Sequence, residues 1–263
     1  MDRAPDPPPP HAAGFIVTLY GDAIVPRGGE VWIGTLIETC ALVGISETLV
    51  RTAVSRLVGA GQLQGLRQGR RSFYRLTDAA KAEFQAAARV IYGPPDATGW
   101  RLVHLPDDDA LARLERQGFA RLRPGLALGP ARGAPPEGAL VFESVVTGDA
   151  AALPGLAASL WDLAPHAAAY RAFLARFGAL GTGLAGPEAL AARLLMVHDW
   201  RRALLRDPRL PAAALPPDWP GHAARLVFHR LYSALSPAAE AHIDATFQGA
   251  EGRIPGRLEI LQM

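Results

Sequence analysis

Arginine side chains crowd one stretch of the chain, residues 45–77. Six arginines lie in it, and no Asp or Glu follows Glu47 within it, whereas the whole chain carries a net charge of only +2. Arginine forks onto phosphate oxygens and onto the edge of guanine, so an acid-poor cluster of arginines is typical of nucleic-acid binding. The six residues are Arg51, Arg56, Arg67, Arg70, Arg71 and Arg75.

The first half of this stretch has the pattern of an amphipathic helix. Ser46 is a favourable N-cap, and Glu47 follows it at the positive end of the helix. Gly59 and Gly61 end the helix. Apolar residues recur at helical spacing and predict the core-facing arc: Leu49, Val50, Ala53, Val54, Leu57 and Val58. The remaining arc carries polar side chains that can bond base edges or phosphates: Thr48, Arg51, Thr52 and Ser55, with Arg56 at its edge.

A second helix is predicted just before this one. Residues 35–38 have the spacing of a capping box, which predicts a helix that begins at Thr35 and runs to about Val43. Gly44 and Ile45 then form a short turn between the two helices. A helix, a tight turn with glycine and an amphipathic helix are typical of the helix-turn-helix.

A hairpin is predicted just after it. Residues 62–66 and 71–76 have strand patterns on either side of a basic turn at residues 67–70. Such a hairpin is a wing, and the whole predicts a winged helix-turn-helix that binds DNA. A winged helix used only for protein contacts is the alternative. The predicted DNA-binding residues are Ser46, Thr48, Arg51, Thr52, Ser55, Arg56, Arg67, Arg70, Arg71 and Arg75.

Several motifs resemble those of the PaaX family, whose members repress operons for phenylacetic acid degradation. The resemblance is close over the first 92 residues, looser in the middle, and returns in the last third. It implies a middle domain similar to the Cas2 fold and an acyl-coenzyme A effector such as phenylacetyl-CoA. The motifs occupy residues 15–22, 27–34, 44–46, 50–57, 69–77, 197–202, 206–211 and 217–221.

The composition is typical of a globular protein, and the length suits more than one compact domain. The chain has 263 residues, of which 49% are hydrophobic and 20% are charged. Its single cysteine, Cys40, cannot form an internal disulfide and is predicted to fill space in a core. The N-terminus lacks a signal pattern, and the apolar run at residues 150–161 is too short to span a bilayer. We therefore expect cytoplasmic localisation without membrane contact.

The order of predicted elements indicates an α+β, multi-domain fold. A strand at residues 100–105, a helix at 107–117 and strands at 119–128 and 139–147 predict a ferredoxin-like middle domain, in line with the Cas2-like fold that the resemblance implies. After Leu153 only helices are predicted, at residues 160–177, 187–205, 223–235 and 237–247, the last with Ser236 as its N-cap. The predicted parts are a disordered tail (1–12), a winged helix-turn-helix domain (13–92), the middle domain (97–150) and an all-α C-terminal domain (151–263).

Two acidic motifs raise the alternative of metal chemistry. Asp107, Asp108 and Asp109 follow a predicted strand, and Cas2 nucleases use an aspartate near such a position. Acidic residues at a helix start are also explained by the helix dipole alone. His198 and Asp199 form a single pair inside a helix, without further ligands at matched spacing. We therefore expect neither a metal site nor catalytic residues.

A second cluster of arginines in the C-terminal part is a candidate ligand site. The predicted effector-binding residues are Arg201, Arg202, Arg206 and Trp219. Arginine binds phosphate, and coenzyme A carries three phosphates, so the acyl-CoA effector implied by the resemblance would suit such a site. The other interpretation is that these arginines cap a surface helix and form salt bridges there.

The sequence thus predicts a homodimeric repressor that is not an enzyme and has no cofactor. It would bind operator DNA of an aromatic-acid catabolic operon and be released by an aryl-acyl-CoA effector. The family resemblance favours an operon for phenylacetate degradation. Three alternatives stay open: a metal-dependent nuclease or hydrolase that uses the middle domain, a related regulator of an unrelated pathway, and an activator.

Overall fold

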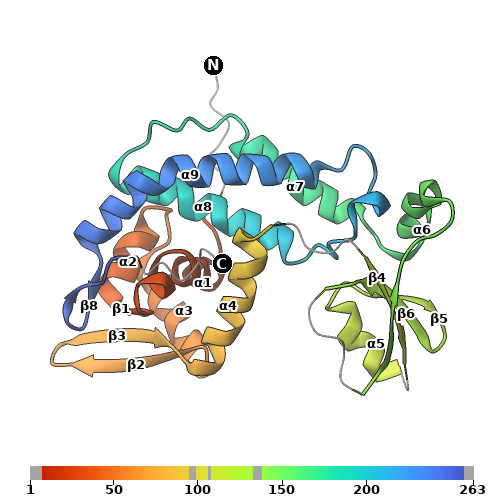
Figure 1. Cartoon of the computed structure of the whole chain (residues 1–263). Helices are drawn as coiled ribbons and strands as arrows, with labels where there is room; N and C mark the ends of the chain where they lie inside the picture. The colour runs from red at the N-terminus through yellow and green to blue at the C-terminus, as the bar shows by residue number, and fades with distance from the viewer. Residues whose placement is uncertain (1–7, 95–98, 106–107, 133–137, 258–263) are drawn as a thin grey trace. The chain divides into compact units, whose positions relative to one another are not determined.

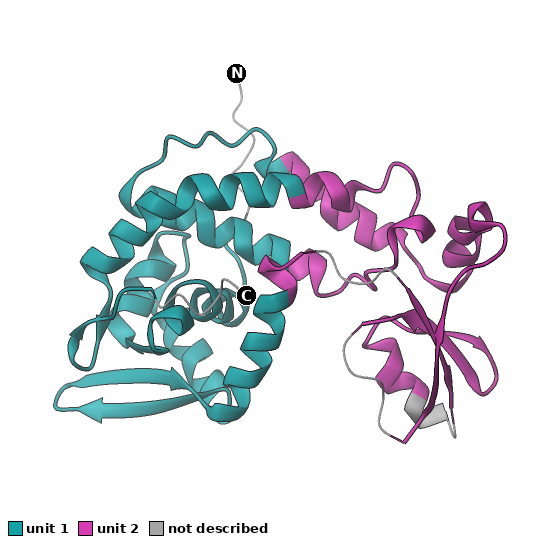
Figure 2. Ribbon diagram, in the orientation of Figure 1, with its two compact units in different colours: residues 1–89, 176–201, 226–263 teal, residues 90–175, 202–225 magenta. Residues whose placement is uncertain are grey.

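The computed structural model describes residues 8–94, 99–105, 108–132 and 138–257. It mixes helices with small antiparallel sheets, so the predicted α+β class is confirmed. The chain forms two compact units, and each is built from segments that are not consecutive in the sequence (Figure 2). The first unit holds residues 1–89, 176–201 and 226–263, and the second holds residues 90–175 and 202–225. No helix in the described part of the chain is both long and apolar enough to cross a membrane.

Helices form most of the first unit. Helix α1 (Ala12–Leu19) continues through a π-helical turn (Tyr20–Ile24) into a 3-10 turn (Val25–Arg27). Helices α2 (Ile33–Ala41) and α3 (Glu47–Gly59) follow, and α4 (Asp78–Tyr92) begins where Thr77 Oγ1 accepts the Ala80 amide. The C-terminal part adds segments of α7 (Ala164–Phe177), α8 (Gly186–Leu204) and α9 (Pro220–Thr246).

A three-stranded antiparallel sheet lies beside these helices (Figure 1). Strands β2 (Leu63–Gln68) and β3 (Arg71–Leu76) form the predicted hairpin, with Gln68 opposite Arg71. Strand β1 (Glu30–Trp32) pairs with β3, which gives the order β1-β3-β2. The predicted hairpin is therefore confirmed.

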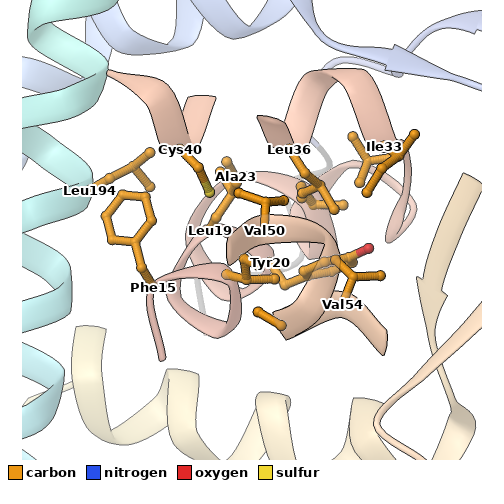
Figure 3. Packing of buried hydrophobic residues seen from close by; sticks show 14 of the residues in the cluster. Phe15, Leu19, Tyr20, Ala23, Ile33, Leu36, Cys40, Val50, Val54 and Leu194 are labelled. Atoms are coloured by element: carbon orange, nitrogen blue, oxygen red, sulfur yellow. The ribbon is translucent and has the colours of Figure 1, made fainter. Parts of the chain in front are cut away.

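One hydrophobic core joins the N-terminal helices to the C-terminal ones. In Figure 3, Phe15, Leu19 and Cys40 lie together with Val50 of α3 and Leu194 of α8. Further C-terminal members of this core are Leu190, Ala239, Ile243 and Phe247. The segment 151–263, predicted as one helical domain, is thus divided between the two units, and α8 and α9 complete the core of the first.

The structure corrects three local predictions in this unit. Helix α2 begins at Ile33 and not at Thr35, because the Thr35 hydroxyl accepts the backbone amide of Gln248 instead of capping the helix. Helix α9 runs unbroken through Pro237, and the Ser236 hydroxyl donates to the Tyr232 carbonyl within the helix. Burial of α9 in the core outweighs the one backbone hydrogen bond that proline removes. Two short strands, β8 (Gln248–Gly249) and β9 (Gly252–Arg253), follow where none was predicted.

The second unit contains a four-stranded antiparallel sheet. Its strands are β4 (Trp100–His104), β5 (Ala120–Arg123), β6 (Leu126–Pro130) and β7 (Leu140–Ser144), in the order β5-β6-β4-β7. The predicted strand at 119–128 is wrong, because Gly125 (φ 74°) turns it into the β5–β6 hairpin. Helix α5 (Asp108–Glu115) packs on one face through Leu111 and Leu114, against Val103 and Ala127.

Short helices complete the second unit. A 3-10 turn (Ala150–Ala152) leads into α6 (Leu153–Leu160), and a further 3-10 turn spans Ala212–Ala214. Helix α7 begins at Ala164, so the predicted start at residue 160 is four residues early.

Candidate nucleic-acid interface

Helix α3 is capped as its sequence predicts. The Ser46 hydroxyl accepts the amide of Leu49 at 3.5 Å. In the preceding turn, Gly44 has a φ of 79°, a left-handed conformation that favours glycine. The amide of Ile45 returns to the Cys40 carbonyl at 3.1 Å, and the Ile45 side chain is buried. The cap and the buried Ile45 side chain fix the direction in which α3 leaves α2.

The buried arc of α3 is narrower than predicted. Val50, Ala53, Val54 and Leu57 are buried, whereas Leu49 is 54% exposed and Val58 is 38% exposed. The prediction that these last two belong to the core is wrong. Helix α3 packs mainly on α1, with α2 and β2 at its sides, and the two residues lie at the margins of that contact.

The outer face of α3 is polar, as predicted. Its exposed side chains include short ones near the N-terminal end, and the hydroxyl of Thr52 donates to the carbonyl of Thr48 at 2.8 Å. The Arg51 guanidinium pairs with Glu47 one turn earlier, with both Nε and Nη2 at 2.8 Å from Oε1. The predicted residues exposed on this face are Ser46, Thr48, Arg51, Thr52, Ser55 and Arg56.

The hairpin carries the other predicted arginines on its surface. Arg67, Arg70, Arg71 and Arg75 are all exposed. Gly69 at the tip has a φ of 60°, and its carbonyl accepts from Arg67 Nε at 3.3 Å. Three of these arginines therefore surround the turn, while Arg75 lies at the base of the hairpin.

Arg71 is held by an aromatic ring. Its guanidinium carbon lies 5.1 Å from the ring centroid of Trp32, a cation–π contact. Trp32 in turn lies over Gly34, where a Cβ would overlap the indole ring. Sequence reasoning missed this role of Trp32, and the signal available was an aromatic residue in the strand that pairs with the hairpin.

The predicted effector-binding residues do not fall in one unit. Arg201 belongs to the first unit, where Nη2 donates to the Gly14 carbonyl at 3.0 Å. Arg202 and Arg206 are exposed in the second unit. Trp219 is buried there, with its ring edge-on to Tyr170. The structure thus gives Arg201 and Trp219 packing roles, and effector binding by the four residues stays a prediction.

The candidate metal ligands are held by other contacts or lie outside the described residues. His198 is buried and hydrogen-bonds through Nδ1 to Thr18 Oγ1 at 3.0 Å. Asp199 pairs with Arg176 at 2.6 Å. Asp107 lies outside the described residues, as do the side chains of Asp108 and Asp109. Among the side chains that are described, no three His, Cys, Asp or Glu residues gather as metal ligands.

A buried ionic network in the first unit escaped sequence reasoning. Arg193 is fully buried and contacts Asp22 Oδ2 at 2.9 Å and Glu240 Oε1 at 2.6 Å. Tyr232 donates to Asp22 Oδ1 at 3.0 Å, and its ring lies under the Arg193 guanidinium. Burial and the nearby Asp22 carboxylate raise the pKa of Tyr232 to about 12, so the phenol stays a donor. The available signal was Arg193, which interrupts the apolar run at residues 189–197 of α8.

The network extends to a second buried arginine. Arg27 pairs with Glu240, lies 3.5 Å from Asp244 Oδ1, and donates to the Ala23 carbonyl at 3.0 Å. Burial lowers the pKa of Arg27, while the Asp244 carboxylate opposes that shift. Arg257 joins from the C-terminal segment, with Nη1 at 2.8 Å from Glu240 Oε1. The network therefore ties the two turns that follow α1 to α8 and α9.

Comparisons with known proteins agree with these features. Family models match residues 11–80 as a PaaX-like protein and residues 161–245 as a PaaX-like protein C-terminal domain. The transcriptional repressor PaaX of Escherichia coli (strain K12) is 32% identical over 276 residues, which cover 94% of this chain and 87% of the relative. An uncharacterized protein of Mycobacterium tuberculosis, Rv0674, has a solved structure with a TM-score of 0.56 and 26% identity, covering 88% of this chain and 98% of that one. The chain therefore belongs to the PaaX-like family, a family of regulators and not of enzymes.

Proposed function

We propose that this chain is a DNA-binding transcriptional repressor. The observation that carries the proposal is the exposed basic surface formed by α3 and the β2–β3 hairpin, in a chain 32% identical to a transcriptional repressor. The tight turn between α2 and α3, with Ile45 buried, and the basic hairpin after α3 support a winged helix-turn-helix. Helix α3 would enter the major groove, and the wing would contact phosphates or the minor groove.

The proposal is tested by the affinity of the full chain for DNA. Genomic fragments bound by the protein define the operator, and gel shifts compare it with a scrambled duplex. Arg51→Ala is expected to weaken operator binding by about 1–3 kcal/mol, because Arg51 lies on the outer face of α3 where a base contact is made. Arg89→Ala is the matched control, since it removes the same charge from an exposed position on α4. Equal losses in the two variants would contradict this role of α3.

The effector part of the proposal is release from DNA by an aryl-acyl-CoA, such as phenylacetyl-CoA. The family to which the chain belongs supports it, and a phenylacetate-type operon is the matching target. Arg202 and Arg206 are the exposed members of the predicted site and would bind phosphates of coenzyme A. A ligand shifts the protein away from DNA only if it binds the released state more tightly.

Effector control is tested on the operator complex. Phenylacetyl-CoA is expected to release the protein, whereas phenylacetate and coenzyme A alone are not. A double variant, Arg202→Ala with Arg206→Ala, is expected to keep operator affinity and to need more effector for release. Unchanged effector sensitivity of this variant would remove the two arginines from the site.

The dimer is proposed to form through the second unit. Its strand order, β5-β6-β4-β7, supports the ferredoxin-like, Cas2-like assignment and leaves β7 at an edge of the sheet. Leu140, Phe142 and Val145 on and just after β7 are 59%, 51% and 82% exposed, an apolar surface suited to a second copy. Phe142→Asp is expected to give monomers in light scattering. Leu226→Asp is the control, because it places the same charge at an exposed apolar residue outside β7.

A further inference from the structure

The Glu47–Arg51 pair leaves one particular edge of the guanidinium available. Nε and Nη2 of Arg51 both lie 2.8 Å from the same oxygen, Glu47 Oε1. A guanidinium has five N–H donors arranged around a plane. The pair uses the edge formed by Nε and Nη2, so the end-on edge, formed by Nη1 and the second hydrogen of Nη2, points away from the carboxylate.

The side chains around this edge are short. Thr48 and Thr52 flank Arg51 on the exposed face of α3, and Ser55 lies one turn further on. Short side chains allow a helix to approach the floor of a groove closely. Arg51 also lies in the N-terminal half of α3, the part of a recognition helix that contacts base edges. Its end-on edge is therefore placed to meet a base.

Glu47 lies in the first turn of α3, where the helix dipole favours a carboxylate, but that effect does not require the pair with Arg51. Both side chains are 57% exposed, and an exposed i,i+4 pair contributes little in water. Glu47 is moreover the one acidic residue of residues 45–77, and a negative charge on a phosphate-facing surface weakens attraction to every DNA sequence. Its cost to DNA binding is general, and the effect that could offset this cost at one particular base is what Glu47 does to Arg51.

We propose that Arg51 recognises a guanine through its end-on edge, and that Glu47 is the positioning residue that holds the guanidinium in that orientation. The inference rests on the proposed DNA-binding function and names the base read by α3. Two parallel N–H groups match O6 and N7 of guanine in the major groove, which no other base presents as a pair of acceptors. Glu47 fixes the arginine before DNA arrives, so less side-chain freedom is lost on binding.

The arrangement predicts opposite effects on specific and non-specific binding. Without the carboxylate, Arg51 is free to reach a phosphate in any sequence, and a repulsive charge is gone. Glu47→Gln is therefore expected to keep or raise affinity for random duplex DNA and to lower the preference for guanine. A merely structural role of Glu47 predicts that both affinities fall together.

The experiment begins by selecting binding sites for the full-length protein from a randomised duplex library. The selected duplex is then made with 7-deazaguanine, which lacks the N7 acceptor, at each guanine in turn. Inosine at the same positions is the control, because it keeps O6 and N7. The wild-type protein is expected to lose about 10-fold or more in affinity at one 7-deazaguanine position in each half-site, and little with inosine.

The variants identify the residue that makes this contact. Arg51→Ala is expected to be insensitive to 7-deazaguanine there, because alanine has no donor for O6 or N7. Arg51→Lys is expected to keep only part of the sensitivity, because the ammonium can still donate to these acceptors but lacks the planar fork of arginine. Glu47→Gln is expected to be less sensitive than wild type, with undiminished affinity for random DNA. Full sensitivity in the Arg51 variants would overturn the inference, and so would a Glu47→Gln protein whose base preference changes at another position. If the wild-type protein selects no sequence at all, the proposed function itself fails.

Discussion

Arginine serves two different purposes in the first unit, and the contrast is set by burial. On α3 and the hairpin, the arginines are exposed and largely surrounded by water. Between the turns that follow α1 and helices α8 and α9, Arg27 and Arg193 are buried at 1% and 0% exposure and are paired with carboxylates. The first group is available to a ligand, whereas the second is committed to the fold.

The energetic consequences differ in the same way. Removing the partner of an exposed arginine costs little folding stability, because water replaces the partner. A buried arginine has no such replacement, so removing its carboxylate leaves an unpaired charge in a medium of low dielectric. We therefore expect stability to depend on the buried group and DNA affinity to depend on the exposed group.

The largest effect is expected from breaking the buried pair. Asp22→Ala leaves Arg193 without one of its two carboxylates and should lower the free energy of unfolding by about 3–5 kcal/mol. Asp22→Asn combined with Arg193→Met removes both charges. The double variant should lose clearly less stability than the sum of the losses from Asp22→Asn alone and Arg193→Met alone. Urea denaturation measures both, with Glu38→Ala at an exposed site as the control. Additive losses would show that the pair has no coupling energy.

A large effect on DNA binding, without one on stability, is expected from the wing. Neutralising Arg67, Arg70 and Arg71 together should reduce the dependence of log affinity on log salt by about 0.9 for each phosphate that the wing no longer neutralises. The free energy of unfolding should change by no more than about 1 kcal/mol, since the three side chains are exposed and the contact of Arg71 with Trp32 is worth roughly 0.5–1 kcal/mol. A wild-type salt slope in this variant would show that the wing does not bind DNA.

Most features predicted from the sequence were local ones. The Ser46 cap, the turn at Gly44 and the hairpin depend on residues close together in the chain, and the structure confirms them. Two of the failures involve contacts between distant segments. The core position of α8 depends on Leu194 meeting Phe15, and α9 continues through Pro237 into Ala239 and Ile243, which are buried in the same core.

The same distinction applies to the sites. The arginines of α3 and the hairpin were found because they cluster within residues 45–77. The buried network was missed because Asp22, Arg193 and Glu240 are scattered over the chain and no spacing rule joins them. Exposure of Leu49 was also missed, because periodicity places a residue on a side of a helix without giving the width of the packed face.

A smaller effect is expected at the contact between the β2–β3 hairpin and strand β1. Trp32→Leu removes the ring under Arg71 and should weaken DNA binding about 2–5-fold, as an exposed cation–π contact is worth roughly 0.5–1 kcal/mol. Arg71→Ala should then weaken binding less in the Trp32→Leu protein than in the wild type. Independent effects of the two changes would contradict a positioning role for Trp32. Phe84→Leu on α4 is the control, because it also shortens a partly buried aromatic side chain of this unit.

The smallest effect is expected at Cys40, which can report on both groups of arginines. Its thiol is buried beside Leu36 and Leu194, and burial raises its pKa to about 12. At pH 8 the thiol is therefore protonated as well as inaccessible, and iodoacetamide should modify it only when the core opens. The wing variant should be labelled as slowly as the wild type, because the exposed arginines do not stabilise the core. Asp22→Ala should be labelled faster at the same urea concentration, and labelling as slow as in the wild type would show that the network is not coupled to the packing around Cys40.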